Sequence, residues 1–330
     1  MSGAPGRLKP SSHRSAWNEG IEVSWHSVTS EPNQLGESPF WHPHEQMLYW
    51  VDIAEKTVLR CNVFIGTVER WRMAPPHELE PGCIAPALGG GLVMGLRDGV
   101  YRARHWGGEL TCLLKFTHDN ATTRANDGKC DAVGRFWVGS VDEAKVKASA
   151  ELISLDCRAP GPITVQRQAD GALTGNGLAW SPDNRTVYWS DTSRHVIYAW
   201  DWDADSNRMH RQREFQRFAP KPAGWQSGMP GYRGRPDGAA VDRLGNYWVA
   251  MYEGARLLQL APTGELLADI PTPMLCPTMP CFGGDDLQTL YLTSARKGRG
   301  AHELEAQPLS GCVVSMRVAV PGLPVNFFKD

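Results

Sequence analysis

Four polar motifs, each beside a run of β-forming residues, hold the side chains that could do chemistry. They are Glu37, Arg124-Ala-Asn-Asp127, Asn176 and Asp237. Two of them supply a carboxylate and a third supplies an amide oxygen. Oxygen ligands of this kind suit a hard divalent cation that keeps several positions for water or substrate. Arg124 and Asn126 add hydrogen-bond donors that could hold hydroxyl groups or a carbonyl group.

A structural role is the alternative for each of these residues taken singly. A glutamate can cap a turn, and Asn or Asp before Gly commonly forms one. Their shared position at the head of a repeated unit instead favours a common site. We therefore interpret Glu37, Asn176 and Asp237 as ligands of one cation, whose two positive charges would balance the two carboxylates. Without the ion these carboxylates would repel each other. Asp127 is expected to brace its loop, and Lys129 to be solvated or paired.

The repeated unit is clearest at residues 124–141. Here a polar loop (124–129) precedes an Asp-Ala-Val-Gly turn (131–134) and a strand (135–141) that is rich in aromatic and β-branched residues. The same order of polar head, short strand, Asp-rich turn and aromatic strand recurs before Trp50, Trp189, Trp248 and Tyr291. A weaker copy with a glycine turn occupies residues 83–94. The chain therefore contains six copies of one unit.

The spacing of these copies predicts the fold. The anchor positions Trp50, Val93, Trp137, Trp189, Trp248 and Tyr291 are roughly 43 to 59 residues apart. Periods near this length, with several strands in each unit, are typical of a β-propeller, in which blades packed around a ring bury one another's faces. We predict an all-β, six-bladed β-propeller. Its ring would be closed by an N-terminal strand (21–28) that joins the last blade beside residues 311–320. A β-sandwich is the alternative.

The division of the chain follows from this reading. We expect a disordered or frayed N-terminal tail at residues 1–18, a single propeller domain at 19–322, and a C-terminal tail at 323–330. A Pro- and Gly-rich insertion at 219–236 stands directly before Asp237. It is either a passive surface loop or a lid over the site.

Charge and composition exclude several classes of protein. The 330 residues carry a formal net charge of -2 and no long basic run, which disfavours binding to nucleic acid or to a membrane surface. No apolar run is long enough to span a bilayer, and the first residues lack the apolar segment of a signal peptide. Eight scattered cysteines without a Cys-x-x-Cys pair are typical of reduced thiols. We expect a cytoplasmic monomer or weak dimer.

Several other catalytic motifs are absent or incomplete in this sequence. Gly89-Gly-Gly91 lacks the Gly-Lys-Ser/Thr of a phosphate-binding loop, and neither His-Glu-x-x-His nor Gly-x-Ser-x-Gly is present. A nucleotide-binding protein of that type, a zinc protease of that type and a serine hydrolase are therefore disfavoured.

The stretch Arg-x-Asn-Asp-Gly-Lys-x-Asp-x-x-Gly-Arg-Phe-Trp-x-Gly at 124–139 closely resembles the signature of the SMP-30/gluconolactonase/LRE family. Glu37-Ser-Pro, Asn176-Gly-Leu-Ala-Trp, Pro236-Asp-Gly238 and Cys281-Phe-Gly-Gly284 match the same family in the same order, and the resemblance spans roughly residues 20–317. The resemblance implies a six-bladed propeller with one catalytic divalent metal ion.

The resemblance also implies a role for each site residue. Metal ligands fall on Glu37, Asn176 and Asp237, and Asp237 would also be the general base for water. Substrate contacts fall on Arg124, Asn126 and, just past the Trp-x-Gly strand, Glu143.

The implied reaction is metal-dependent hydrolysis of a sugar lactone, such as a glucono-, galactono-, arabino- or xylonolactone, to the aldonic acid. The metal would polarise the carbonyl. It could be Ca²⁺, Zn²⁺, Mn²⁺, Mg²⁺ or Fe²⁺. Two alternatives stay open: a non-catalytic propeller that binds calcium or protein partners, and a metal-dependent esterase or phosphotriesterase on the same scaffold.

Overall fold

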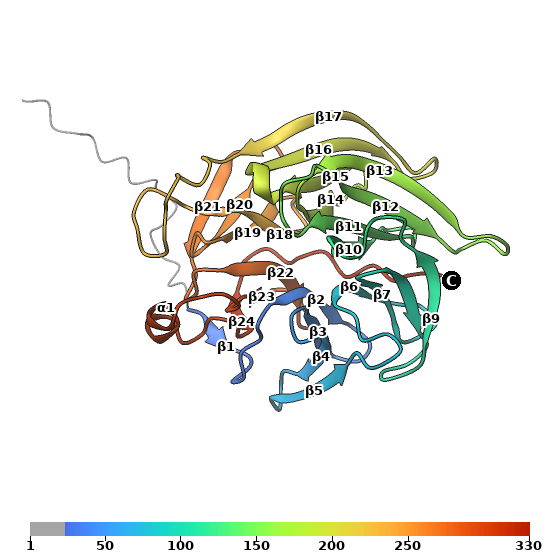
Figure 1. Cartoon of the computed structure of the whole chain (residues 1–330), viewed down its shortest axis with the longest axis horizontal. Coiled ribbons are helices and arrows are strands. Elements are labelled where there is room, and N and C mark those ends of the chain that lie inside the picture. The colour runs from blue at the N-terminus through green and yellow to red at the C-terminus, as the bar shows by residue number, and fades with distance from the viewer. Residues whose placement is uncertain (1–23) are drawn as a thin grey trace, which may run out of the picture.

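Six four-stranded antiparallel sheets surround a common centre in the computed structural model, which describes residues 24–330 (Figure 1). The first strand of each sheet lies nearest the centre and the fourth lies at the rim. This is the predicted six-bladed propeller. The tail expected at 1–18 and the start of the strand expected at 21–28 lie outside the described residues.

Blades 1 to 3 take their strands in chain order from the innermost outward. Blade 1 contains β2 (Gly36–His42), β3 (Met47–Asp52), β4 (Thr57–Asn62) and β5 (Thr67–Arg72). Blade 2 contains β6 (Pro81–Pro86), β7 (Leu92–Leu96), β8 (Gly99–Ala103) and β9 (Leu110–Lys115). Blade 3 contains β10 (Thr123–Cys130), β11 (Phe136–Asp142), β12 (Ala150–Asp156) and β13 (Thr164–Ala172).

Blades 4 to 6 complete the ring. Blade 4 contains β14 (Gly175–Trp180), β15 (Thr186–Asp191), β16 (Val196–Asp203) and β17 (Arg208–Arg217). Blade 5 contains β18 (Arg235–Val241), β19 (Tyr247–Tyr252), β20 (Arg256–Leu260) and β21 (Leu266–Pro271). Blade 6 contains β22 (Pro277–Gly283), β23 (Thr289–Ser294), β24 (Val314–Arg317) and β1 (His26–Ser27). A 3-10 turn (Thr192–Arg194) and helix α1 (Ala301–Ala306) are short additions to these sheets.

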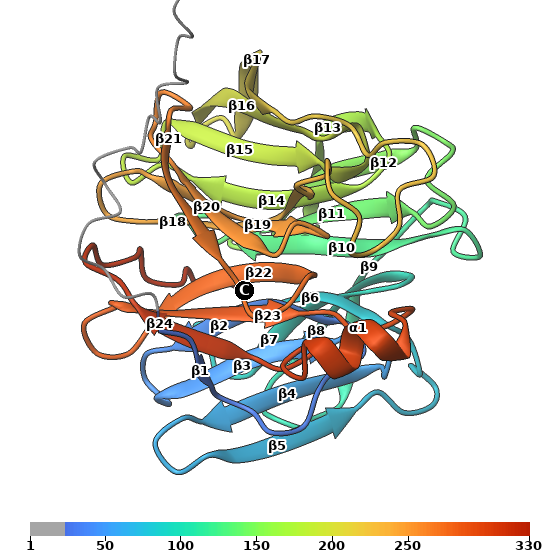
Figure 2. The same cartoon turned by 90° about the vertical axis from the view of Figure 1, so that its left-hand side faces the viewer.

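Blade 6 joins the two ends of the described chain, as predicted. Strand β1 pairs antiparallel with β24, with His26 opposite Ser315 and Ser27 opposite Val314 (Figure 2). The adjoining backbone adds a hydrogen bond from Val28 N to Val313 O. The closing strand is shorter than predicted, because within the described residues only His26 and Ser27 pair.

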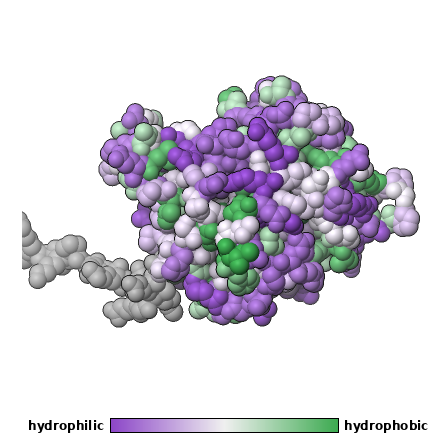
Figure 3. Space-filling view, turned by 90° about the horizontal axis from the view of Figure 1, so that it is seen from below, coloured by the Kyte–Doolittle hydropathy of each residue, from purple (hydrophilic) through white to green (hydrophobic). Residues whose placement is uncertain are grey.

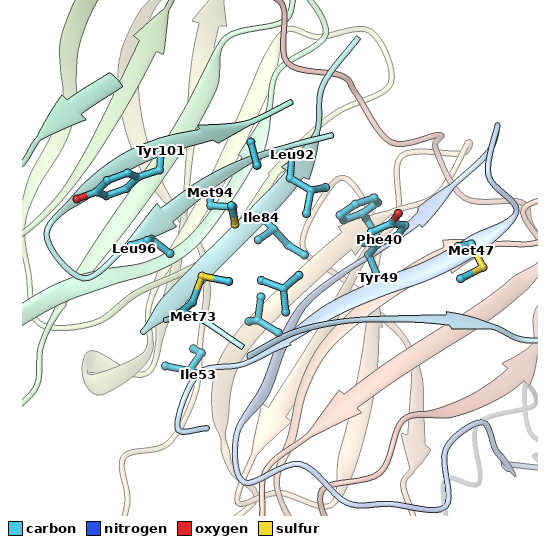
Figure 4. Close-up of a cluster of buried hydrophobic side chains, with 13 residues drawn as sticks. Phe40, Met47, Tyr49, Ile53, Met73, Ile84, Leu92, Met94, Leu96 and Tyr101 are labelled. Atoms are coloured by element: carbon cyan, nitrogen blue, oxygen red, sulfur yellow. The ribbon is translucent and has the colours of Figure 1, made fainter. Parts of the chain in front are cut away.

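The hydrophobic core is divided among the six interfaces between neighbouring blades. Each of six buried clusters draws its members mainly from two adjacent blades. Between blades 1 and 2, for example, Phe40, Tyr49, Ile84 and Met94 point toward one another (Figure 4). Radial packing thus buries both faces of each sheet, which one blade alone could not do.

The aromatic anchors of the repeat fall into two sets that face opposite ways. Trp137 and Trp248 pack against the following blade, whereas Trp50 and Trp189 pack against the preceding one. The strand registers explain the difference. Trp137 and Trp248 pair with Lys129 and Ala240, whereas Trp50 and Trp189 lie opposite the register breaks of β2 and β14. Because side chains alternate along a strand, a shift of one residue reverses the face.

An aspartate fixes the turn before each of the two forward-facing tryptophans. Oδ1 of Asp131 accepts hydrogen bonds from backbone N–H groups of its turn, and Oδ2 accepts from Trp137 Nε1 at 2.9 Å. Asp242 makes the same contacts with its turn and with Trp248 Nε1, also at 2.9 Å. Both aspartates are fully buried. In blades 3 and 5 this contact couples the Asp-rich turn to the aromatic strand that follows it.

The end of the chain covers one end of the central channel; we name residues 322–330 the base segment. It runs across the middle of the ring from blade 5 toward blades 2 and 3 (Figure 1). Phe328 forms a parallel bridge with Ala87 and has no exposed surface, and Asp330 forms ion pairs with Arg102 and Arg104 at 3.1 and 2.8 Å. The tail expected at 323–330 is therefore packed against the ring.

A cavity of about 270 Å³ lies over the base segment and is lined by residues of all six blades. Its lining includes the lower parts of the innermost strands, such as Phe40, Trp41 and Ile84, and Leu323–Asn326 of the base segment. We refer to this end of the channel as the base, and to the opposite end, where the innermost strands begin, as the mouth.

The cysteines, the helices and the surface add three smaller observations. All eight cysteines lie within the described residues and none is in a disulfide. Among residues 24–330 no helix is long and apolar enough to cross a bilayer. One side of the molecule is mostly hydrophilic, with a compact hydrophobic group near its middle (Figure 3).

Candidate metal and substrate site

The polar motifs lie within the innermost strands, and the predicted loop at 124–129 is wrong. Residues 123–130 form β10, and Glu37, Asn176 and Asp237 lie in β2, β14 and β18. A run of polar residues can form a strand here because one face of an innermost strand looks into a channel. The polar residues that suggested a loop at 124–129 therefore reflect a strand that faces the channel.

A break in register next to these residues aims their side chains. The pairing of the innermost strand with its neighbour shifts between Glu37 and Phe40, between Ala125 and Gly128, between Asn176 and Ala179, and between Pro236 and Ala239. A β-bulge bends its strand and redirects a side chain. Glu37 and Asn176 come directly before the bulge, whereas Asn126 and Asp237 lie within it. The four side chains therefore occupy two adjacent positions of the repeat, where the sequence suggested one.

Asn126 connects blades 3 and 4 at the mouth. Its Nδ2 donates to Asn176 Oδ1 and to Gly175 O, each at 2.8 Å. Asn176 Nδ2 in turn donates to Thr192 Oγ1 at 2.9 Å. These contacts fix the orientation of the Asn176 amide, whose oxygen keeps a second lone pair for another partner.

Glu37 and Asp237 come from blades 1 and 5 and act on each other electrostatically. Burial first, and then the charges of Asp237 and Asp127, hold the pKa of Glu37 well above its usual range. Burial likewise raises the pKa of Asp237 to about 7, against the opposing charge of Arg235. Asp237 is buried and Glu37 is partly buried. Carboxylates crowded in this way are relieved by a bound cation.

Asp127 adds a third carboxylate to this space. Its Oδ2 accepts a hydrogen bond from Leu178 N at 2.8 Å, so it braces the strand of the next blade as well as its own. Its Oδ1 is buried and has no hydrogen-bond partner within the described part of the chain. A buried carboxylate oxygen without a partner needs a ligand or water to satisfy it. From the sequence we expected Asp127 only to brace its loop.

Lys129 crosses the channel. Its ammonium group donates to Ala239 O of blade 5, and the charge of Asp127 acts on it favourably. Burial nevertheless lowers its pKa. Of the two states expected for this lysine, solvated or paired, the first is excluded because its ammonium group bonds to Ala239 of blade 5.

Arg124 and Glu143 lie at the rim of the mouth. Arg124 Nη1 donates to Asn126 Oδ1 at 2.9 Å, and its Nε lies 3.5 Å from Glu143 Oε1. Glu143 also pairs with Arg97 at 2.9 Å and is 40% exposed, whereas Arg97 pairs with Glu80 at 2.8 Å. We name these four residues the blade 2–3 cluster. Here Glu143 holds two arginines in place.

A second ion-pair cluster lies across the mouth and ties down the 219–236 insertion. Glu253, only 6% exposed, pairs with Lys221, Arg235 and Arg299 at 2.9, 2.9 and 3.1 Å, and Arg299 pairs with Glu303 at 2.6 Å. We name these five residues the blade 5–6 cluster. Tyr232 OH and His195 Nε2, 2.8 Å apart, hold the other end of the insertion. The insertion therefore borders the mouth.

The donor set at the mouth is made of oxygen atoms from carboxylate and amide groups. Within residues 24–330 no three His, Cys, Asp or Glu side chains form a metal-binding group. The predicted set contains two carboxylates and one amide, so it falls outside such a group. The free Asp127 oxygen, the oriented Asn176 amide and the raised carboxyl pKa values suit a hard cation with oxygen ligands.

Comparison with known proteins adds independent findings. A family model described as SMP-30/Gluconolactonase/LRE-like region matches residues 35–296. The chain is 39% identical over 303 residues to 6-deoxy-6-sulfogluconolactonase from Pseudomonas putida, across 91% of this chain and 97% of that protein. It is 32% identical over 302 residues to regucalcin from Danio rerio, across 90% and 95%.

Solved structures share the fold. A calcium-binding protein, regucalcin, from Agrobacterium tumefaciens superposes with a TM-score of 0.83 at 21% identity, across 93% of this chain and 98% of that one. A luciferin-regenerating enzyme gives a TM-score of 0.80 at 24% identity, across 93% and 100%. At these identities the likeness speaks for the fold alone.

Proposed function

Because the chain belongs to the SMP-30/gluconolactonase/LRE family, we propose that it is a lactonase that hydrolyses a sugar lactone to the aldonic acid. The observation that carries the proposal is the meeting of oxygen ligands and hydrogen-bond donors from blades 1, 3, 4 and 5 at one mouth of the channel. The 39% identity to a sulfogluconolactonase supports the substrate class.

Glu37, Asn176 and Asp237 are the residues that would hold a divalent cation. When bound, the cation would supply Lewis-acid polarisation of the lactone carbonyl. Asp237 would accept the proton of the attacking water, and Arg124 and Asn126 would orient the sugar through its hydroxyl groups. The amide N–H groups of Asn126 already donate to Gly175 O and Asn176 Oδ1 of blade 4. Arg124 would therefore be the stronger hydrogen-bond donor to the substrate.

The charged mouth argues against the esterase alternative. Two ion-pair clusters border the site, whereas a pocket for an apolar ester needs apolar walls. The alternative of a calcium-binding protein without catalysis uses the same oxygen ligands. Such a protein would bind the ion but would not hydrolyse a lactone, and this difference distinguishes it from a lactonase.

A substrate and metal panel tests the proposal. The protein is stripped with a chelator and assayed by acid release against glucono-, galactono-, arabino- and xylonolactones, with Ca²⁺, Zn²⁺, Mn²⁺, Mg²⁺ or Fe²⁺ restored singly. We expect the chelator to stop lactone hydrolysis and at least one ion to restore it. Turnover of aryl esters or phosphotriesters without lactone turnover would support the esterase. Ion binding with no turnover of any substrate would support the calcium-binding alternative.

A further inference from the structure

We propose that Lys145 forms an anion-binding subsite at the mouth of the channel, and that the preferred substrate carries a negatively charged group remote from its lactone carbonyl. This inference rests on the proposed lactonase function. It assigns a role to a residue that the sequence did not single out and that no contact in the site described above requires.

The loop that carries Lys145 is held in a defined shape. It joins β11 to β12 at the mouth, where Asp142 ends β11 opposite Thr123 at the start of β10. Asp142 Oδ2 accepts hydrogen bonds from Val146 N at 2.7 Å and from Lys147 N at 2.8 Å. Lys145 itself has a φ of 56°, a left-handed conformation that is uncommon for a residue with a side chain. The backbone therefore fixes where the lysine side chain starts.

Lys145 lies between the two ion-pair clusters. The charges that act on its ammonium group are those of Arg235 and Glu253 from the blade 5–6 cluster, Arg124 from the blade 2–3 cluster, and Asp237 in the channel. Burial and the charge of Arg235 lower its pKa, against the attraction of the two carboxylates. The backbone places the loop beside the mouth: two residues before Lys145, Glu143 N donates to Thr122 O just before β10, and the Glu143 carboxylate lies 3.5 Å from Arg124 Nε.

The two ion-pair clusters together carry one more positive charge than negative charge. The blade 2–3 cluster balances two arginines with two glutamates, whereas the blade 5–6 cluster has three cations for two glutamates. Among residues 24–330 no carboxylate lies within ion-pair distance of Lys145, and the residue keeps exposed surface although protein atoms crowd its ammonium group. A lysine held close to two arginines without a carboxylate partner raises their mutual repulsion, which an anionic ligand would relieve.

The shape of the channel determines where such a group would sit. The base segment and its apolar cavity occupy the far end, so substrate would approach the carboxylates from the mouth. A lactone whose carbonyl faces Glu37, Asn176 and Asp237 would leave its distal substituent at the rim beside Lys145. A sulfonate or phosphate at that end of the sugar would meet the ammonium group through charge-assisted hydrogen bonds.

Selectivity between matched lactones tests the proposal. The metal-loaded full chain is assayed with D-glucono-1,5-lactone and with its 6-phospho and 6-deoxy-6-sulfo counterparts. We expect a higher kcat/KM for at least one anionic lactone than for the neutral one. Lys145→Gln should lower the anionic-to-neutral ratio of kcat/KM by about tenfold, and Lys145→Glu should lower it further. The two anionic arms show whether sulfonate or phosphate is preferred.

Lys147→Gln is the matched control, because Lys147 lies two residues along the same loop and also has no ion pair among the described residues. Its selectivity ratio should equal that of the wild type. A Lys145→Gln ratio equal to wild type, or a wild type that prefers the neutral lactone, overturns the proposal. An equal loss on every lactone also overturns it, since that result would assign Lys145 to the carboxylate that all products share.

Binding of a product provides a readout that needs no turnover. Calorimetry with 6-phosphogluconate and with gluconate should show tighter binding of the former, and this advantage should shrink about tenfold in Lys145→Gln. If no lactone is hydrolysed but this difference is observed, the proposed activity fails and the subsite stands. If lactones are hydrolysed and no difference is observed, the activity stands and the subsite fails.

Discussion

The mouth and the base of the central channel are built from the same six strands, and yet they differ in every physical respect. At the mouth the strands are bulged and carry Glu37, Asn126, Asp127, Asn176 and Asp237. At the base the same strands carry apolar side chains, and the base segment covers them. Like charges crowd together at the mouth at a cost in stability, whereas the base contributes stability through burial. The difference indicates that function and stability are separated along the channel axis.

The largest expected effect is at the mouth. Asp237→Asn keeps the size of the side chain and removes its charge, so kcat should fall by about a thousandfold or more while the melting temperature does not fall. Lactone assays and thermal unfolding of the same sample check this. Asp286→Asn, in an exposed ion pair with Arg317, is the control and should retain full activity. If Asp237→Asn retained wild-type kcat with the ion present, the mouth would lose its assignment as the catalytic end.

At the base, Phe328→Ala should mainly affect stability. Phe328 is fully buried in the cluster between blades 2 and 3, so truncation should lower the free energy of unfolding by about 3 kcal/mol. Urea unfolding measures this loss, and the kcat of the folded enzyme should be unchanged. A fall in kcat without a loss of stability would show that the two ends are coupled.

The pH dependence of the metal-free protein should expose the crowding at the mouth. Asp237 has a folded pKa of about 7, above the value of about 4 in an unfolded chain, so the folded state binds its proton more tightly. The contribution of Asp237 to stability should therefore be fully present below pH 4 and should fall by roughly 1 to 3 kcal/mol as the pH rises toward 8. Unfolding in the presence of chelator measures the decline. Asp237→Asn should make it shallower, and an equal decline in the variant would contradict this account.

A smaller effect is expected from Asp127→Asn. The amide oxygen can still accept the Leu178 N–H, so the brace between blades 3 and 4 is kept while one negative charge is lost. The dissociation constant for the divalent ion should rise about tenfold, as is usual when a supporting partner of a metal site is changed. Calorimetric titration of metal into the stripped protein measures this directly. Unchanged affinity would limit Asp127 to its bracing contact.

Local contacts account for what the sequence predicted well. The turn aspartates Asp131 and Asp242 each bind the tryptophan six residues later, so in blades 3 and 5 a local contact couples the turn to the strand after it. The spacing of these units predicted the six blades that the structure contains. Ring closure by the N-terminal strand followed from the need to protect the edges of the last blade.

Long-range contacts account for what the sequence missed. The reach of Lys129 to Ala239 and the packing of Phe328 beside Ala87 depend on neighbours far along the chain. The polar residues of β10 looked like a loop because a channel-facing strand is uncommon outside this architecture. Glu37 and Asp237 occupy positions of the repeat that differ by one residue, because Glu37 precedes the bulge of its strand and Asp237 lies within the bulge of its own. A bulge is visible only in the pairing of the strands, so the sequence did not show this difference.

Blade 6 has a consequence for how the molecule forms. Its outermost strand, β1, comes from the start of the described chain, and its other three strands come from the end. Five blades can assemble from neighbouring stretches of chain, but the sixth needs an encounter across nearly the whole length. Contacts of such separation form slowly. We therefore expect the docking of β1 to be a late, rate-limiting event, after which all six blades resist unfolding together.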